Sequence, residues 1–424
     1  MILIYDANSP HPDRSALPTP TSLPINSQTP PLIHAATPPL APQQKITAFR
    51  SMLSSRSLRI WSFVHRWTSI VCTAFMLLLC LTGLPLVFGH ELDVLLGDAI
   101  EAPELPAHQS NARASYDAIL NSALAKNPGH VPQYMIWEPD ESMLPIVVTA
   151  PRPDTPPDDT QSTTIDARTA RALGAPPGKG SLKFILLKLH VDMFAGLPGK
   201  LFLGAMGVSF VVAIVSGVVV YLPFWKKVGL GRVRIKKSRR IAWLDGHNAL
   251  GMLTLVWALL VGATGSINTL ADLLLDAWRN DQLAQMLAPY QGKPPVKATA
   301  SVDEAIKIAR DKTPSMIPSF VAFPGTRFSS PHHYTVFMRG DGILTTRMLR
   351  PVLIDAETGK LTDSRELPWY LTLLLGSQPL HFGDFGGMPL KIFWAAFDVL
   401  TIVVLGSGLY IWLSRGNKNK RKPA

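Results

Sequence analysis

Residues 65–89 read HRWTSIVCTAFMLLLCLTGLPLVFG, and this stretch decides the fold because nothing between Trp67 and Gly89 is charged. A helix of about 20 residues crosses the hydrocarbon core of a bilayer, which is roughly 30 Å thick. Three further stretches are long and apolar enough to cross it: Leu201 to Leu222, Leu250 to Ala271 and Ile392 to Leu413. The sequence therefore predicts four membrane-spanning helices.

The composition agrees with a membrane protein. Of 424 residues, 47% are hydrophobic and 17% are charged, whereas about 25% are charged in an average soluble protein. The net charge of +11 comes mostly from residues that flank the apolar stretches, so we expect no nucleic-acid binding. Cys72 and Cys80 fall in the first span, about 12 Å apart along a helix, which is too far for a disulfide.

The basic residues also predict the orientation. They cluster before the first span, in the connection 225–245 and in the tail 414–424, and Lys and Arg are enriched on the cytoplasmic side of membranes. We expect both termini in the cytoplasm of a bacterium, and segments 90–190 and 272–388 on the periplasmic side of its inner membrane. Residues 1–45 are rich in Pro, Ser and Thr, which predicts a disordered tail without the apolar core of a signal peptide.

Each periplasmic segment has the pattern of a small α+β module. Residues 115–126 and 302–312 read as helices. The strand-like stretches are 133–137, 144–150 and 163–173 in the first module, and 319–323, 333–339 and 352–361 in the second. The predicted fold is a membrane all-α four-helix bundle of two tandem span-module-span repeats, with two periplasmic α+β modules. The four spans are expected at 60–89, 198–224, 247–271 and 389–413.

An internal repeat relates four histidines. In each half, one histidine stands 17 residues before a Thr-Gly pair, and another stands 26 residues before a Ser-Gly pair. These are His65 with Thr82-Gly83, His247 with Thr264-Gly265, His190 with Ser216-Gly217 and His381 with Ser407-Gly408. Such self-similarity indicates a duplication. We expect a pseudo-twofold axis along the membrane normal, because two spans return the chain to its starting side.

That axis makes two histidine pairs. His65 and His247 would face each other at the cytoplasmic edge, and His190 and His381 at the periplasmic edge. Two facing imidazoles in a bundle suit a planar cofactor held through its two axial positions. A single histidine at a membrane interface is more often an anchor, but four at repeat-related places favour a functional interpretation. The glycines of the repeat would allow close helix packing and make room for a porphyrin face.

Other polar residues leave alternatives open. No His-Glu-x-x-His motif of a zinc site is present, although Asp192 and Asp384 could orient an imidazole or join a surface metal site. His90 could replace a periplasmic ligand, but an interface position is favoured. Asp398, inside the fourth span, could carry protons, hydrogen-bond a ligand or be neutralised by packing. His332 and His333 are expected in surface loops of the second module.

These runs of residues resemble a known family. They are His65-Arg66-Trp67 with Leu81-Thr82-Gly83, Leu189-His190 with Ser216-Gly217-Val218, Gly246-His247 with Gly265, and Leu380-His381-Phe382-Gly383 with Gly408-Leu409-Tyr410-Ile411-Trp412. Together they are similar to the PepSY-associated transmembrane family over about 60 to 415, and the outer modules look like degenerate PepSY domains. The Pro-rich linker Pro151 to Pro157 departs from the family pattern and leaves the substrate open.

The resemblance implies a haem protein. Family members include ferric-siderophore reductases with two haems, so it implies two haem b groups, one on His65 and His247 and one on His190 and His381. The expected function is reduction of a periplasmic ferric siderophore or other chelate. No nucleotide-binding motif is present, so the electron donor would be a quinol or a cytoplasmic flavoprotein. The alternatives are a membrane anchor for modules that bind or regulate a periplasmic protein, and a siderophore transporter.

Overall fold

The computed structural model describes residues 54–419 except 107–111, 139–140, 230 and 344. The predicted disordered tail 1–45 and the last five residues of the basic tail lie outside the described residues.

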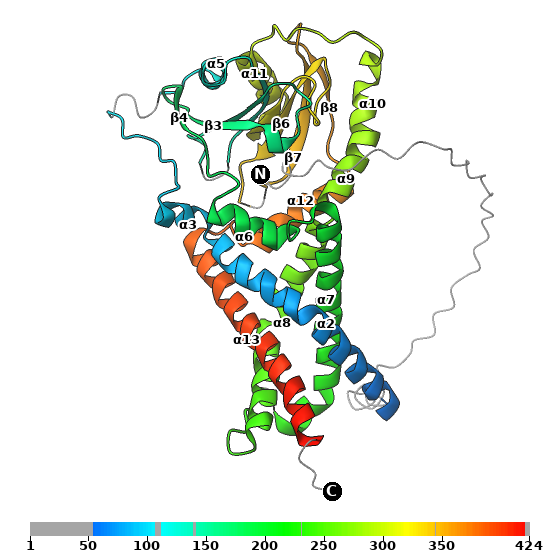
Figure 1. The fold of residues 1–424 in the computed structure, drawn as a ribbon. Coiled ribbons are helices and arrows are strands. Elements are labelled where there is room, and N and C mark those ends of the chain that lie inside the picture. Colours follow the sequence, from blue (N-terminus) through cyan, green and yellow to red (C-terminus); the bar gives the residue numbers. More distant parts are fainter. Residues whose placement is uncertain (1–53, 107–111, 139–140, 230, 344, 420–424) are drawn as a thin grey trace, which may run out of the picture.

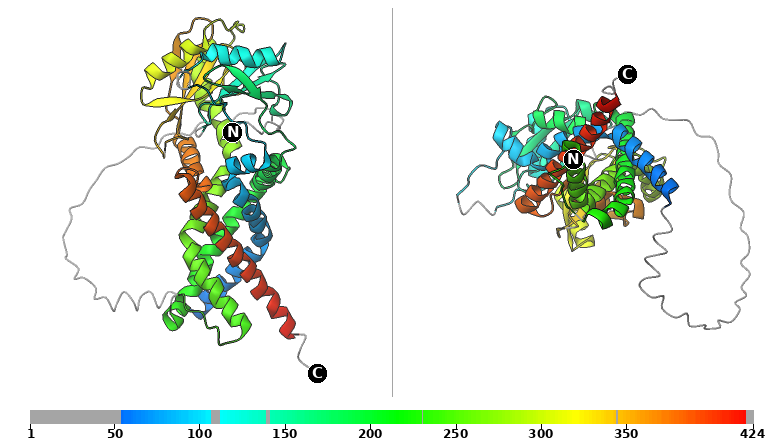
Figure 2. Two further views of the ribbon diagram at one scale, coloured as in Figure 1. Left: turned by 90° about the vertical axis from the view of Figure 1, so that its left-hand side faces the viewer. Right: turned by 90° about the horizontal axis from the view of Figure 1, so that it is seen from below.

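Four long helices are long and apolar enough to cross a membrane. They are α2 (Ser55–Val87), α7 (Gly196–Val228), α8 (Arg239–Asn268) and α13 (Gly387–Asn419). Helices α2 and α8 each contact both α7 and α13, so the four lie side by side (Figures 1 and 2). Helix α2 begins well before the predicted span because Ser54 caps it by accepting a hydrogen bond from the Ser57 amide, and the Arg residues that follow are good helix formers.

The strands and most of the remaining helices form a head at one end of the long helices (Figure 1). Eight strands make one antiparallel sheet in the order β4-β3-β2-β1-β5-β6-β7-β8. Their bounds are β1 Val131–Ile136, β2 Ile146–Ala150, β3 Gln161–Asp166, β4 Arg171–Gly174, β5 Met316–Ala322, β6 His333–Gly340, β7 Leu349–Asp355 and β8 Leu361–Ser364.

The two segments predicted as separate modules therefore share a sheet. Strand β1 of the first pairs with β5 of the second, with Tyr134 opposite Ala322 and Ile136 opposite Phe320. An unpaired central edge would leave a row of backbone donors and acceptors without partners. Pairing satisfies both edges at once, so the head folds as one continuous layer.

Helices cover both faces of this sheet. On one face, α5 (Tyr116–Lys126) and α11 (Val302–Lys312) bury Ile119 and Ile306 against Met135 and Met338. On the other face, α9 (Ala271–Trp278), α10 (Ala284–Leu287) and α12 (Trp369–Phe382) contribute to a second apolar core. The second core connects the head to the long helices, because α9 directly follows α8 and α12 precedes α13.

Short helices between the head and the long helices were not predicted as separate elements. They are α3 (Gly89–Leu96), α6 (Leu182–Val191) and α12 (Figure 1). Two of the predicted site residues lie near their ends: His190 on α6 and His381 on α12. Gly383 ends α12 in a left-handed conformation (φ 67°), which turns the chain toward α13.

His332 and His333 are not in surface loops, and that prediction is wrong. The two residues are 4% and 0% exposed. His333 begins β6, which is buried on both faces because helices cover each side of the sheet. Its Nδ1 lies 2.7 Å from Ser330 Oγ, and its ring packs edge-on against Tyr290. Burial lowers the pKa of His333 to about 4.

Candidate functional site

The four repeat-related histidines meet as two pairs. The ring centroids of His65 on α2 and His247 on α8 are 6.4 Å apart. Those of His190 on α6 and His381 on α12 are 6.2 Å apart. We call His190 and His381 the head-side pair, since they lie beside the head, and His65 and His247 the distal pair.

Each imidazole lies against a glycine of a long helix from its own half of the chain. A Cβ added to Gly83 would come within 2.9 Å of His190 Cε1, and one added to Gly265 within 2.8 Å of His381 Cε1. His65 stands in the same relation to Gly217 at 2.9 Å, and His247 to Gly408 at 3.3 Å. The repeated histidine-to-glycine spacing in the sequence thus corresponds to four equivalent close contacts.

Hydrogen bonds fix the other edge of each ring. Nδ1 of His65 lies 2.8 Å from Ala213 O, that of His247 3.0 Å from Val404 O, and that of His381 3.1 Å from Val261 O. Each of these carbonyls is four residues before the glycine that the ring contacts. A carbonyl only accepts, so Nδ1 must carry the proton and Nε2 must carry a free electron pair.

His190 reaches the same state through a hydroxyl. Its Nδ1 lies 3.1 Å from Thr82 Oγ1, while that hydroxyl donates its own hydrogen to Leu78 O at 2.7 Å. Thr82 Oγ1 therefore accepts from Nδ1–H. Thr264 occupies the corresponding place beside His381, at 3.5 Å.

The spacing of the pairs can be compared with metal ligation. Two metal–nitrogen bonds of about 2 Å each, plus the half-width of each ring, put the ring centroids about 6 Å apart. Within the described ranges, no group of three or more His, Cys, Asp and Glu side chains is placed to hold a metal ion. Two facing imidazoles suit a metal that arrives with its own equatorial ligands, as the iron of a porphyrin does. The residues of both pairs fit such a group.

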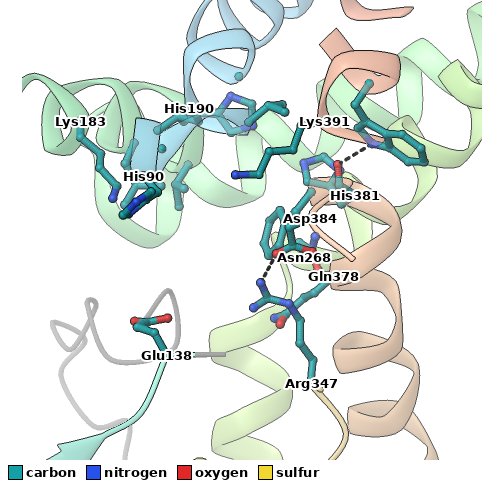
Figure 3. A pocket seen from close by; sticks show the side chains of 18 of the residues that line it. His90, Glu138, Lys183, His190, Asn268, Arg347, Gln378, His381, Asp384 and Lys391 are labelled. Atoms are coloured by element: carbon teal, nitrogen blue, oxygen red, sulfur yellow. Dashed lines mark hydrogen bonds and ion pairs between the residues drawn. The ribbon is translucent and has the colours of Figure 1, made fainter. Parts of the chain in front are cut away.

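A large cavity opens beside the head-side pair. Its volume is about 1040 Å³, and its lining comes from the long helices, the short helices α3, α6 and α12, and the sheet. Figure 3 shows the two histidines with the charged residues around them. Cations and acids from different elements pair at its wall: Lys183 with Asp93, Lys200 with Asp272, Lys391 with Glu91, and Arg347 with Asp384. Ligand cavities typically measure about 300–1,000 Å³, so this one is large enough for a sizeable ligand.

The accessory residues named from the sequence do not join the pairs. His90 Nδ1 lies 2.8 Å from Glu141 Oε1 at the cavity wall. Asp192 pairs with Lys188 and caps the Phe194 amide, and Asp384 pairs with Arg347. These two carboxylates neutralise cations, and the hydrogen bonds of the described residues give neither an imidazole partner.

The sequence did not predict the cavity or the polar residues that line it. Asn268, at the end of α8, accepts a hydrogen bond from Ser377 Oγ at 3.1 Å. Its buried amide nitrogen has no hydrogen-bond partner in the described part of the chain. Gln378 is 5% exposed beside it (Figure 3). The available signal was an Asn and a Gln in otherwise apolar stretches, where polar groups are costly.

Comparisons with known proteins agree with the resemblance. An uncharacterised protein of Pseudomonas aeruginosa is 26% identical over 255 residues, which cover 54% of this chain and 63% of that protein. The match thus spans less than two thirds of the relative. The family described as the PepSY-associated TM region matches residues 62–415, a range that includes all four paired histidines. The chain belongs to the PepSY-associated TM region family.

Proposed function

We propose that the chain is a two-haem electron-transfer protein of the bacterial inner membrane that reduces a ferric siderophore or other ferric chelate in the periplasm. His65 and His247 hold one haem b, and His190 and His381 hold the other. Each group supplies a one-electron Fe(III)/Fe(II) couple when bound. The electrons come from the cytoplasmic side or from a quinol.

The observation that carries this proposal is the state of the four imidazoles. Each donates Nδ1–H to a carbonyl or hydroxyl oxygen and keeps Nε2 available, and the rings face each other in pairs. A hydrogen bond to the far nitrogen fixes the tautomer and orientation of a metal-binding histidine and raises its basicity. Anchoring at a membrane interface needs neither the pairing nor the common tautomer.

Charge supports the orientation. The connection before α8 contains Arg232, Arg234, Lys236 and Lys237, and α8 itself begins at Arg239, at the end of the long helices away from the head (Figure 1). Because basic residues favour the cytoplasmic side, the head and its cavity would lie in the periplasm. Siderophores bind Fe(III) through hard oxygen donors better than Fe(II), so one-electron reduction beside this cavity would unload the chelate.

The first experiment is a spectrum and a haem assay on the full-length protein in detergent. We expect Soret and α bands and two haems per chain, and one haem fewer in His65→Ala and in His381→Ala. His90→Ala, which removes a cavity histidine outside the pairs, should keep both. Absence of the bands, or unchanged haem content in the two pair variants, rejects the proposal and favours a protein-binding membrane anchor.

A second experiment separates a reductase from a transporter. A ferric chelate is added outside vesicles that contain the protein, with and without a reductant enclosed in the vesicle lumen. Formation of Fe(II) and uptake of the chelate are then measured separately. The proposal expects Fe(II) outside the vesicle lumen only when reductant is present. Uptake of the intact chelate without reductant would instead identify a siderophore transporter.

A further inference from the structure

The floor of the cavity carries two buried polar atoms without partners. Trp257 on α8 is 9% exposed and Asp398 on α13 is 8% exposed, and both line the cavity. Within the described residues, Trp257 Nε1 and Asp398 Oδ2 have no hydrogen-bond partner. One is a donor and the other, when ionised, is an acceptor. An unsatisfied polar group inside a membrane is strongly unfavourable. The two atoms therefore favour a ligand that can form hydrogen bonds with them.

These atoms lie between the two histidine pairs. Trp257 is four residues, about 6 Å of helix, before Val261, whose carbonyl binds His381. Asp398 is four residues after Trp394, whose indole donates to the backbone carbonyl of His381, and six residues before Val404, which binds His247. The floor is therefore deeper in the bundle than the head-side pair and belongs to the same cavity.

The walls around the two atoms are aromatic and apolar. Trp257 packs against Trp394 with ring centroids 6.4 Å apart, and Phe210 lines the same region. Cys80 of α2 lines the cavity as well. We define the cavity floor as Cys80, Phe210, Trp257, Trp394, Asp398 and Thr401. These six residues include one acid and no base, so a phosphate or a carboxylate ligand would be repelled there.

We propose that the cavity floor binds the head group of a membrane quinol. A quinol hydroxyl both donates and accepts hydrogen bonds, so one hydroxyl can donate to Asp398 while an oxygen of the ring accepts from Trp257 Nε1. The flat ring fits between aromatic side chains, which favour offset or edge-on contacts. The apolar tail of a quinol keeps it in the bilayer, at the depth where the floor lies. This inference rests on the proposed function, for which it names the electron donor. Oxidation of one quinol to the quinone releases two electrons and two protons, so one quinol reduces two ferric ions.

The test uses the full-length protein in detergent, without oxygen, with a short-tailed ubiquinol that carries a photoreactive azide. After illumination, mass spectrometry of digested protein should find the label on peptides of α8 and α13 that contain the floor residues, and excess unlabelled quinol should remove it. Trp257→Phe keeps the ring but loses the donor, and Asp398→Asn loses the charge. Each should weaken binding about tenfold, the equivalent of about 1.4 kcal/mol.

Trp412→Phe is the matched control, because Trp412 lies on α13, is 43% exposed and does not line the cavity. It should bind as the unchanged protein does. Asp398→Asn provides an independent test if Trp257→Phe fails to fold. Equal affinity in all variants, or labelling elsewhere, would overturn the inference.

Haem content measured in the same preparations separates the two proposals. Two haems without labelling of the floor would reject the quinol site and leave the proposed function standing. Specific labelling that Asp398→Asn weakens, in protein without haem, would support the quinol site and reject haem-based electron transfer.

Discussion

Glycine and histidine are matched residue by residue in this bundle. The Cε1 atoms of four imidazoles pack against four glycines. Oxygen atoms of the same long helices accept hydrogen bonds from the Nδ1–H groups of these imidazoles. The sequence could predict which four histidines belong together, because the intervals repeat. It could not predict the hydrogen-bonded carbonyls, since every residue has one.

Substitution of Gly265 tests this contact. An alanine Cβ would lie 2.8 Å from His381 Cε1, closer than carbon atoms pack, so Gly265→Ala should displace the imidazole. We expect the variant to retain one haem of two. Gly251→Ala is the matched control on the same helix, since a Cβ there meets nothing within 4 Å. Equal haem content in both variants would show that the glycine contact does not position the ligand.

His333 shows where residue-level prediction failed. The sequence of 333–339 predicted a strand but not that helices cover both faces of the sheet. Burial lowers its pKa from 6.5 to about 4, so between these values the unfolded chain binds more protons than the folded one. The free energy of unfolding should therefore fall as the pH drops through this window, by at most about 1.4 kcal/mol per pH unit.

Hydrogen exchange of the β6 amides in the full-length protein measures this effect. Protection, corrected for the intrinsic pH dependence of exchange, should decrease from about pH 7 to about pH 5. His333→Asn keeps a polar atom toward Ser330 and cannot titrate in this range, so its loss of protection should be smaller. An identical loss in both proteins would assign the effect to other groups.

At the scale of elements, α5 and α11 cap each other. Asp303 accepts hydrogen bonds from the amides of Tyr116 and Asp117, at 2.9 and 3.1 Å, and Asp117 accepts from the Val302 amide at 2.9 Å. Each carboxylate thus satisfies the first amides of the other helix, where the helix dipole also favours a negative charge. The two halves of the head are linked here as well as through β1 and β5.

Removal of these caps should destabilise the head cooperatively. Asp117→Ala and Asp303→Ala should each cost about 0.5–2 kcal/mol, the usual range for a lost cap, and the double variant should deviate from the sum. Asp311→Ala, on the exposed end of α11, is the control. Hydrogen exchange of the α5 and α11 amides measures the loss of stability in all four variants. If the loss in the double variant equals the sum of the two single losses, the two caps act independently.

Prediction of elements succeeded where local patterns were strong. The bounds of α11 were predicted to the residue, because Ser301 caps its start and its apolar positions recur at helical spacing. Helices α6 and α12 were missed as separate elements because short apolar stretches beside a span have no distinct period. The pairing of β1 with β5 joins residues that are 184 to 188 positions apart in the sequence, and no local pattern specifies a partner at such a distance.

At the scale of the whole molecule, the two histidine pairs are far apart. Helix α8 contacts both pairs. It carries His247 of the distal pair, and its Val261 carbonyl accepts a hydrogen bond from His381 of the head-side pair. Val261 is 14 residues, or about 21 Å, further along the helix than His247. The cavity floor lies between these levels. An electron donor that enters at the floor would thus reach the head-side pair directly, whereas a cytoplasmic donor would meet the distal pair first.

Histidine variants of the two pairs can decide between these donors. In proteoliposomes supplied with a quinol, His190→Ala should abolish reduction of an external ferric chelate, because it removes the pair beside the cavity. His247→Ala should retain most of the quinol-driven reduction if the quinol binds at the floor, and should lose reduction driven by an electron donor enclosed in the vesicle lumen on the cytoplasmic side. One haem per chain in both variants establishes that each has lost only its own site. If His247→Ala abolishes the quinol-driven reaction as well, electrons must enter through the distal pair, and the floor of the cavity is not the entry point.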